Sequence, residues 1–165
     1  MIVLGIDPGS RCCGYGVVQL QTMRCQHIAH GTIRLSQDEV SHRLYALLTS
    51  LQDLMRQYQP DSCAVENVFV AGNPNSALKL GQARGVALAA AASCAIPVHG
   101  YAPRSVKKSV STSGAADKAA VQRMVTHLLH LEKPPAHDAA DALAVAWCHA
   151  QHTLFSVRTI RSSPP

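Results

Sequence analysis

Four acidic residues, distant from one another in the sequence, stand where carboxylates can do chemistry: Asp7, Glu66, Asp138 and Asp141. Asp7 and Glu66 each follow an apolar run typical of a buried strand, and sites in α/β sheets form beyond strand ends. Asp138 and Asp141 lie near the start of an expected helix, at a spacing that puts both on one face. The sequence therefore predicts two carboxylate pairs that can face one crevice.

Most of these acids also have a purely structural explanation. Asp-Pro-Gly is a favourable turn sequence, so Asp7 alone is more often structural than catalytic, and Glu66 alone is a weaker signal still. Asp138, in a first helical turn, gains roughly 0.3 to 1 kcal/mol from the helix dipole. Asp141 does not fit such an explanation, because residues 139–143 are otherwise apolar and an acid there is costly unless it is paired.

Taken together, the four acids indicate bound cations. Carboxylates about 4 Å apart repel by roughly 4 kcal/mol per pair at an effective dielectric near 20, and divalent ions make such a cluster tolerable. Oxygen ligands without thiolates suit Mg²⁺ or Mn²⁺ better than zinc. His137 is either an exposed residue at the helix start or a metal ligand or water-activating group beside Asp138.

The nine histidines raise a zinc alternative. His127 with His130, and His149 with His152, can each share a helical face. Neither pair has a Glu or Cys at ligand spacing, so we expect solvated helix faces instead.

The elements that must position the acids follow from hydrophobic patterning. Residues 2–6, 15–20 and 27–33 are typical of three strands in an antiparallel meander. Helical spacing then covers residues 37–57, 75–93, 117–131 and 137–151, with strands at 62–65 and 97–101. A meander followed by alternating helices and strands predicts an α/β fold, a five-stranded mixed sheet with helices on both faces.

Composition limits the organisation and the partners. The 165 residues, 47% hydrophobic and 15% charged, suit one compact domain, which we assign to residues 1–151 with a flexible tail at 152–165. A formal charge of +5 favours a polyanionic partner. The six cysteines form no C-x-x-C pair, and neither a signal sequence nor a membrane span is evident, so we expect a cytoplasmic protein with reduced thiols and no membrane association.

Four separated motifs together resemble one family. They are GIDPGSR at 5–11, VENVF at 65–69, SALKLGQARG at 76–85 and DAADAL at 138–143. In this order, from residue 2 to about 150, they resemble RuvC, the bacterial Holliday-junction resolvases.

The resemblance implies a ribonuclease H-like nuclease domain and a homodimer that acts in recombination and DNA repair. It implies paired incisions in opposing strands of a four-way DNA junction, and partnership with the branch-migration proteins RuvA and RuvB. The family's metal-binding carboxylates fall on Asp7, Glu66, Asp138 and Asp141, with two Mg²⁺ ions per subunit or Mn²⁺ in their place. Some relatives carry His in place of the third carboxylate, whereas here His137 precedes an intact Asp138.

A basic segment between residues 104 and 118 is the expected DNA contact. It carries Arg104, Lys107, Lys108 and Lys118 with one acid, although an ordinary solvated basic face would look similar. The resemblance makes Lys107 and Lys118 phosphate contacts. It also implies that Phe69, in a loop with glycine and proline, stacks on an unpaired base of the opened junction.

The expected helix at 75–93 is rich in glycine and alanine, so another helix can approach it closely. Packing on its own sheet explains this equally well, but the resemblance makes it the dimer interface, which suits a two-fold symmetric substrate. Two other functions are compatible with parts of this sequence. Residues 5–9 and 14–18 also resemble a phosphate loop of actin-like ATPases, which need two such domains, and a junction-binding protein without nuclease activity would share the basic charge.

Overall fold

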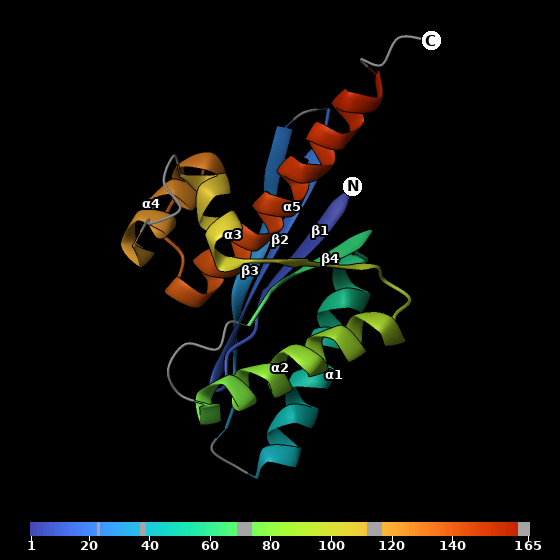
Figure 1. Cartoon of the computed structure of the whole chain (residues 1–165), viewed down its shortest axis with the longest axis vertical. Coiled ribbons are helices and arrows are strands. Elements are labelled where there is room, and N and C mark those ends of the chain that lie inside the picture. Colours follow the sequence, from blue (N-terminus) through green and yellow to red (C-terminus); the bar gives the residue numbers. More distant parts are fainter. Residues whose placement is uncertain (23, 37–38, 69–73, 112–116, 162–165) are drawn as a thin grey trace.

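The computed structural model, which describes residues 1–22, 24–36, 39–68, 74–111 and 117–161, has a five-stranded sheet of order β3-β2-β1-β4-β5 (Figure 1). The strands are β1 (Ile2–Asp7), β2 (Cys12–Gln21), β3 (Arg24–Arg34), β4 (Ser62–Glu66) and β5 (Val98–Tyr101). β1, β2 and β3 form an antiparallel meander, and β4 and β5 continue the sheet parallel to β1. The predicted mixed sheet is confirmed.

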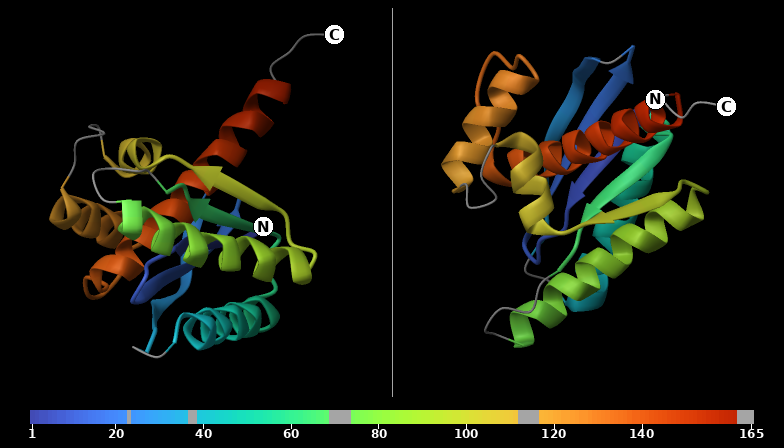
Figure 2. Two further views of the ribbon diagram at one scale, coloured as in Figure 1. Left: turned by 60° about the horizontal axis from the view of Figure 1, so that its bottom comes forward. Right: turned by 45° about the horizontal axis from the view of Figure 1, so that its top comes forward.

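Helices cover both faces of this sheet, as expected. Figure 2 shows the two helix layers from two further directions. Leu4 and Ile6 of β1 pack with α1 (Val40–Tyr58) and α2 (Pro74–Ser93), whereas Val3 packs with α3 (Pro103–Val110), α4 (Lys118–Leu128) and α5 (His137–Arg161). Because side chains alternate along a strand, the residues of β1 supply a separate core to each layer.

Two helices differ from the sequence prediction. α3 was not predicted, although Pro103 at its first turn and the buried Val106 and Val110, four residues apart, are helical signals. Residues 104–110 were predicted only as part of the basic DNA-contact segment 104–118, without a helix. α5 was expected to end at 151 but continues to Arg161, so residues 152–161, assigned to the tail, are helical. The sequence has no glycine or proline in this stretch to end the helix.

Glycines let α5 lie very close to the sheet. A Cβ atom at Gly5 would meet the carbonyl oxygen of Ala142 and lie 2.6 Å from the backbone nitrogen of Ala146. A Cβ at Gly14 would meet the carbonyl oxygen of Asp138. The first turns of α5 are therefore held against the ends of β1 and β2 by contacts between backbones.

His149 of α5 is buried, contrary to the expectation of a solvated helix face. It is 5% exposed, and its ring nitrogens lie 3.0 Å from the Ser62 hydroxyl and 2.8 Å from the Tyr101 hydroxyl. The His99 ring packs on it with centroids 4.5 Å apart. Both nitrogens of His149 are thus engaged with β4 and β5, and they are not free to bind zinc.

This histidine predicts a pH dependence of stability. Burial, reinforced by the nearby His99 and His152, lowers the pKa of His149 from 6.5 to about 4. Its contribution to folding is therefore complete above pH 6.5 and is lost as the pH falls toward 4, by about 3 kcal/mol in total. Urea unfolding of the protein and of His149→Gln between pH 7.5 and 4.5 measures this, and the variant should show a flatter profile. The control His127→Gln, which changes an exposed histidine, should keep the profile of the parent protein. A profile of His149→Gln parallel to that of the parent protein would contradict the prediction.

Candidate active site

Strand register brings Asp7 and Glu66 side by side. Ile6 pairs with Val65 in the parallel β1–β4 ladder, so the two acids that follow leave neighbouring strands at the same edge. Ile6 and Val65 pack toward α1 and α2. Because successive side chains alternate, Asp7 and Glu66 point to the opposite face, the one that α5 covers.

The first turns of α5 bring Asp138 and Asp141 to the same edge. Asp7 pairs with Gly14 across β1 and β2, and the backbone of Asp138 lies directly on Gly14. Asp141, one turn further along α5, is flanked by the buried Ala140 and Ala142. The acids expected to act together thus meet where three elements converge.

The electrostatics show how closely they meet. The pKa of Asp7 is raised to about 8, first by burial and then by the negative charges of the other three carboxylates, while Lys118 lowers it. The pKa of Glu66 is raised by burial and by Asp141, and a hydrogen bond with Asp7 opposes this rise. The other three acids therefore lie close enough to Asp7 to raise its pKa, as expected for a carboxylate cluster.

Asp141 is the acid with the nearest cation. Burial raises its pKa, and the charge of Lys118, whose Nζ lies 3.8 Å from the Asp141 carboxylate, is the largest opposing cause. The exposed His137 and the half-buried Lys107 also lower the pKa of Asp141, whereas Asp138 raises it. His137 therefore stands at the edge of the cluster, close enough to act on Asp141.

The donor set fits a hard divalent cation. All four side chains offer only carboxylate oxygens, which hard divalent cations prefer as ligands. A bound cation would offset the mutual repulsion that contributes to the raised pKa values of Asp7, Glu66 and Asp141. Within the described residues, no three His, Cys, Asp or Glu side chains already have the spacing of ligands around one ion. The chemistry of the donors therefore matches Mg²⁺, and a ligand arrangement requires the carboxylates to turn toward a common point.

The expected DNA-contact residues divide into two groups. Lys107 and Lys118 act on the charges of Glu66 and Asp141, so they lie beside the cluster. Lys108 instead lines a hollow between α3 and α5 with Gln151 and His152 among others, and Arg104 is exposed at the start of α3. Phe69 lies outside the described residues.

Sequence reasoning missed two polar contacts around the acids. Arg84 of α2 donates from Nη2 to Oδ1 of Asn67, 2.9 Å away, which ties α2 to the residue after Glu66. Cys12 makes a hydrogen bond with Asp138 and, with burial as the larger cause, its pKa is raised. A lone arginine in an alanine-rich helix was a signal for the first contact, while nothing in the sequence distinguished Cys12 from the other cysteines.

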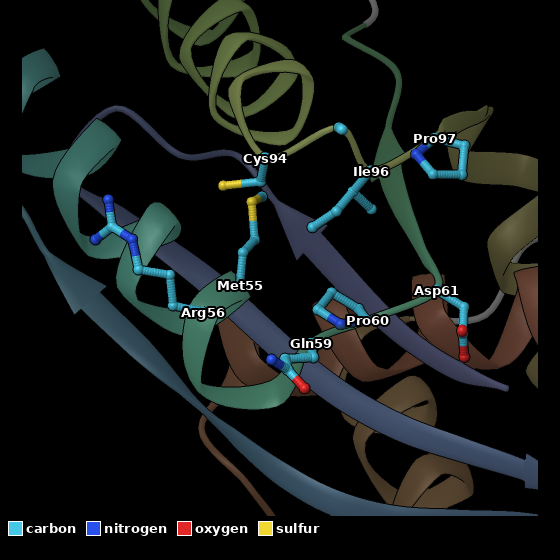
Figure 3. A pocket seen from close by; sticks show the side chains of 9 residues that line it. Met55, Arg56, Gln59, Pro60, Asp61, Cys94, Ile96 and Pro97 are labelled. Atoms are coloured by element: carbon cyan, nitrogen blue, oxygen red, sulfur yellow. The ribbon is translucent and has the colours of Figure 1, made fainter.

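A cavity of about 560 Å³ lies away from this cluster (Figure 3). It is formed where α1 and α2 end, with Met55, Cys94 and Asp61 among its lining residues. Asp61 accepts a hydrogen bond from the backbone nitrogen of Ile2 at 2.6 Å, which marks the opposite end of β1 from Asp7. The cavity is therefore separate from the acids.

Two further properties bear on where the protein works. All six cysteines are free thiols. Among the helices of the described residues, none combines the length and the apolar character needed to cross a membrane.

A sheet of this order, with acids at the ends of β1 and β4 and on the helix packed across them, defines the ribonuclease H-like class of nucleases. The family model described as crossover junction endodeoxyribonuclease RuvC matches residues 3–149. The chain belongs to the RuvC family of crossover junction endodeoxyribonucleases, hydrolases of phosphodiester bonds. The fold and function predicted from the sequence are confirmed at this level.

Individual relatives agree with this assignment. The crossover junction endodeoxyribonuclease RuvC of Vibrio campbellii is 51% identical over 149 residues, 90% of this chain and 86% of the relative. The structure of Thermus thermophilus RuvC in complex with a Holliday junction substrate has a TM-score of 0.85 at 30% identity, covering 94% of this chain and 96% of that one. The yeast mitochondrial resolvase Ydc2 shares the fold, with a TM-score of 0.62 at 16% identity, covering 96% of this chain and 83% of that one. The RuvC family model also covers residues 5–9, the stretch that resembles a phosphate loop of actin-like ATPases. The family match therefore accounts for this motif without an ATPase.

Proposed function

We propose that this protein cuts four-way DNA junctions as a homodimer, by paired symmetric nicks that depend on two Mg²⁺ ions per subunit. Asp7, Glu66, Asp138 and Asp141 are the proposed catalytic and metal-binding residues. The observation that carries the assignment is the convergence of the four acids on one sheet edge, in a chain whose family consists of crossover junction endonucleases.

The roles of the residues follow from their surroundings. The carboxylates hold the ions and position the scissile phosphate, and they do not themselves shuttle protons. When bound, a pair of divalent ions supplies Lewis acidity at the attacking and leaving oxygens of an in-line displacement. Lys107 and Lys118, beside Glu66 and Asp141, offset negative charge where the DNA backbone approaches.

A direct assay tests the proposal. A synthetic four-way junction and a linear duplex of the same sequence are each incubated with the protein in Mg²⁺ or in EDTA. We expect symmetric nicks in the junction only, with Mg²⁺ only. Binding of the junction without nicking would support the alternative of a binding protein, and equal cutting of the duplex would contradict junction selectivity.

Lys107 and Lys108 provide a matched pair of variants. Lys107 acts on the charges of Glu66 and Asp141, while Lys108 lines the hollow against α5. Lys107→Ala should therefore slow junction cleavage about tenfold, which corresponds to about 1.4 kcal/mol of transition-state stabilisation, and Lys108→Ala should change it less. Equal effects in single-turnover assays would mean that only the loss of net charge matters.

Phe69 remains the proposed stacking residue, and Arg104 and Lys108 remain proposed backbone contacts.

The outer face of α2 supports the proposed homodimer. A Cβ added to Gly81 or Gly85 would meet nothing within 4 Å, and Leu78 is 63% exposed. Pro74, Leu78 and Gly81 line a shallow apolar hollow on this face. We expect a dimer at micromolar concentration in sedimentation analysis and a monomer for Leu78→Glu. A monomeric parent protein would contradict the dimer, and a dimeric variant would place the interface elsewhere.

The remaining proposals follow from the family and from the thiols. Residues 1–151 form the nuclease domain, in which Mn²⁺ can replace Mg²⁺. The enzyme works in the cytoplasm, where its six free cysteines stay reduced, and RuvA and RuvB deliver the junction.

A further inference from the structure

A small basic pocket lies at the connection that follows Asp7, outside the segment 104–118. It has a volume of about 150 Å³ and is lined by Ser10, Arg11, Ser36, Arg43 and Lys79. Arg11 belongs to the connection between β1 and β2, directly after the turn that begins at Asp7. Arg43 lies on the first turn of α1 and Lys79 on the second turn of α2. Figure 1 shows this connection and both helix N-termini at the same, lower end of the molecule.

The pocket concentrates positive charge. Its described lining residues include three cations and no acid. The ion pairs in the described ranges, Arg56–Asp53 and Lys118–Asp141, involve none of these cations. The first turn of α2 also lacks acidic residues, so the positive end of its dipole adds to the field, whereas Glu39 at the N-cap of α1 offsets the dipole of that helix. Such a site favours an anion.

The size and the groups identify the anion. A volume of 150 Å³ equals about five water molecules, enough for one phosphate group and its hydration but too little for a base pair. Arginine guanidinium groups bind phosphate oxygens in pairs, and serine hydroxyls are common phosphate donors. The chemistry is that of a backbone phosphate, read without regard to base sequence.

We propose that this pocket binds a backbone phosphate of the DNA strand that runs past Asp7. The inference rests on the proposed function and adds a contact to it. Lys107 and Lys118 approach the carboxylates from the layer of α3 and α4, whereas the basic pocket lies toward α1 and α2. The scissile position is therefore held between two cationic contacts on opposite sides of the sheet, which fixes the register of the strand.

The test compares two double variants with the same change in charge. Arg43→Gln with Lys79→Gln removes two cations from the pocket. Arg24→Gln with Arg56→Gln removes two exposed cations at the other end of the sheet, where Arg56 takes part only in a surface pair with Asp53. Affinity for a four-way junction and for a linear duplex is measured by fluorescence anisotropy in EDTA, at KCl concentrations from about 50 to about 300 mM, which gives the salt dependence of binding.

Loss of one phosphate contact should make the slope of log affinity against log salt shallower by about one for the pocket variant, with both DNAs. The control variant should keep the slope of the parent protein. Equal slopes for the pocket and control variants would overturn the pocket. A parent protein that binds but does not nick the junction would overturn the proposed function instead, while the slopes still decide on the pocket.

Discussion

Asp7→Asn should abolish Mg²⁺-dependent nicking of a four-way junction while leaving junction binding intact. The substitution keeps the size of the side chain but removes the carboxylate that Asp7 would offer to a bound cation, in the field of the other three carboxylates. Loss of ion-based stabilisation of about 4 kcal/mol in the transition state corresponds to roughly a thousandfold slower reaction. Cleavage rates with excess enzyme, and affinity measured in EDTA, separate the two effects. Retained cleavage would remove Asp7 from the site.

The same variant should be more stable than the parent protein. The pKa of Asp7 is raised from 3.8 to about 8, so its contribution to stability is present below pH 3.8 and is lost as the pH rises toward 8. At pH 8 without divalent ions the charged Asp7 therefore opposes folding, and asparagine relieves this. A relief of 1 kcal/mol raises Tm by about 2–4 °C in a chain of this size. Mg²⁺ should raise the Tm of the parent protein more than that of the variant, and an equal rise in both would argue against ion binding at Asp7.

Gly5→Ala should be among the most destabilising single changes in the sheet. Its Cβ would meet the backbone of α5 at Ala142 and Ala146, and also lie 2.8 Å from the Ala146 side chain. Backbone atoms within a helix cannot swing aside, so α5 must lift from β1. Overpacking in a close-packed core costs about 1–3 kcal/mol and sometimes more, and we expect the upper end or beyond. Urea unfolding measures the loss.

A second substitution separates crowding from other causes. Ala146→Gly removes a close side-chain contact of the new methyl group, so the double variant should recover part of the loss, although glycine itself weakens a helix by about 1 kcal/mol. Losses that simply add would mean that Gly5 is required for some reason other than contact with α5. Because the same helix carries Asp138 and Asp141, junction cleavage by Gly5→Ala should fall even at temperatures where the variant is folded.

The sequence was sufficient for the sheet and the acids, since these depend on local signals. Apolar alternation marks a strand, and an acid directly after a buried strand marks its end, which is why Asp7 and Glu66 were found together. Contacts made only by the folded chain were not predictable. His149 was expected on a solvated helix face, yet it follows the apolar Trp147 and Cys148 and is buried against Ser62 and Tyr101. The basic pocket joins Arg11, Arg43 and Lys79 from three elements, so no window of sequence contains it.

Contact between backbones at Gly5 and Gly14 implies an uneven tolerance of sequence change in the two layers. On the side of α1 and α2, Leu47, Leu51 and similar side chains fill the core, and aliphatic residues of similar volume can exchange there at little cost. Across the sheet, the separation of the acids is fixed by peptide groups, whose dimensions no substitution can adjust. Substitutions should therefore be tolerated mainly in the α1–α2 layer of this nuclease, while few are tolerated where α5 meets the sheet.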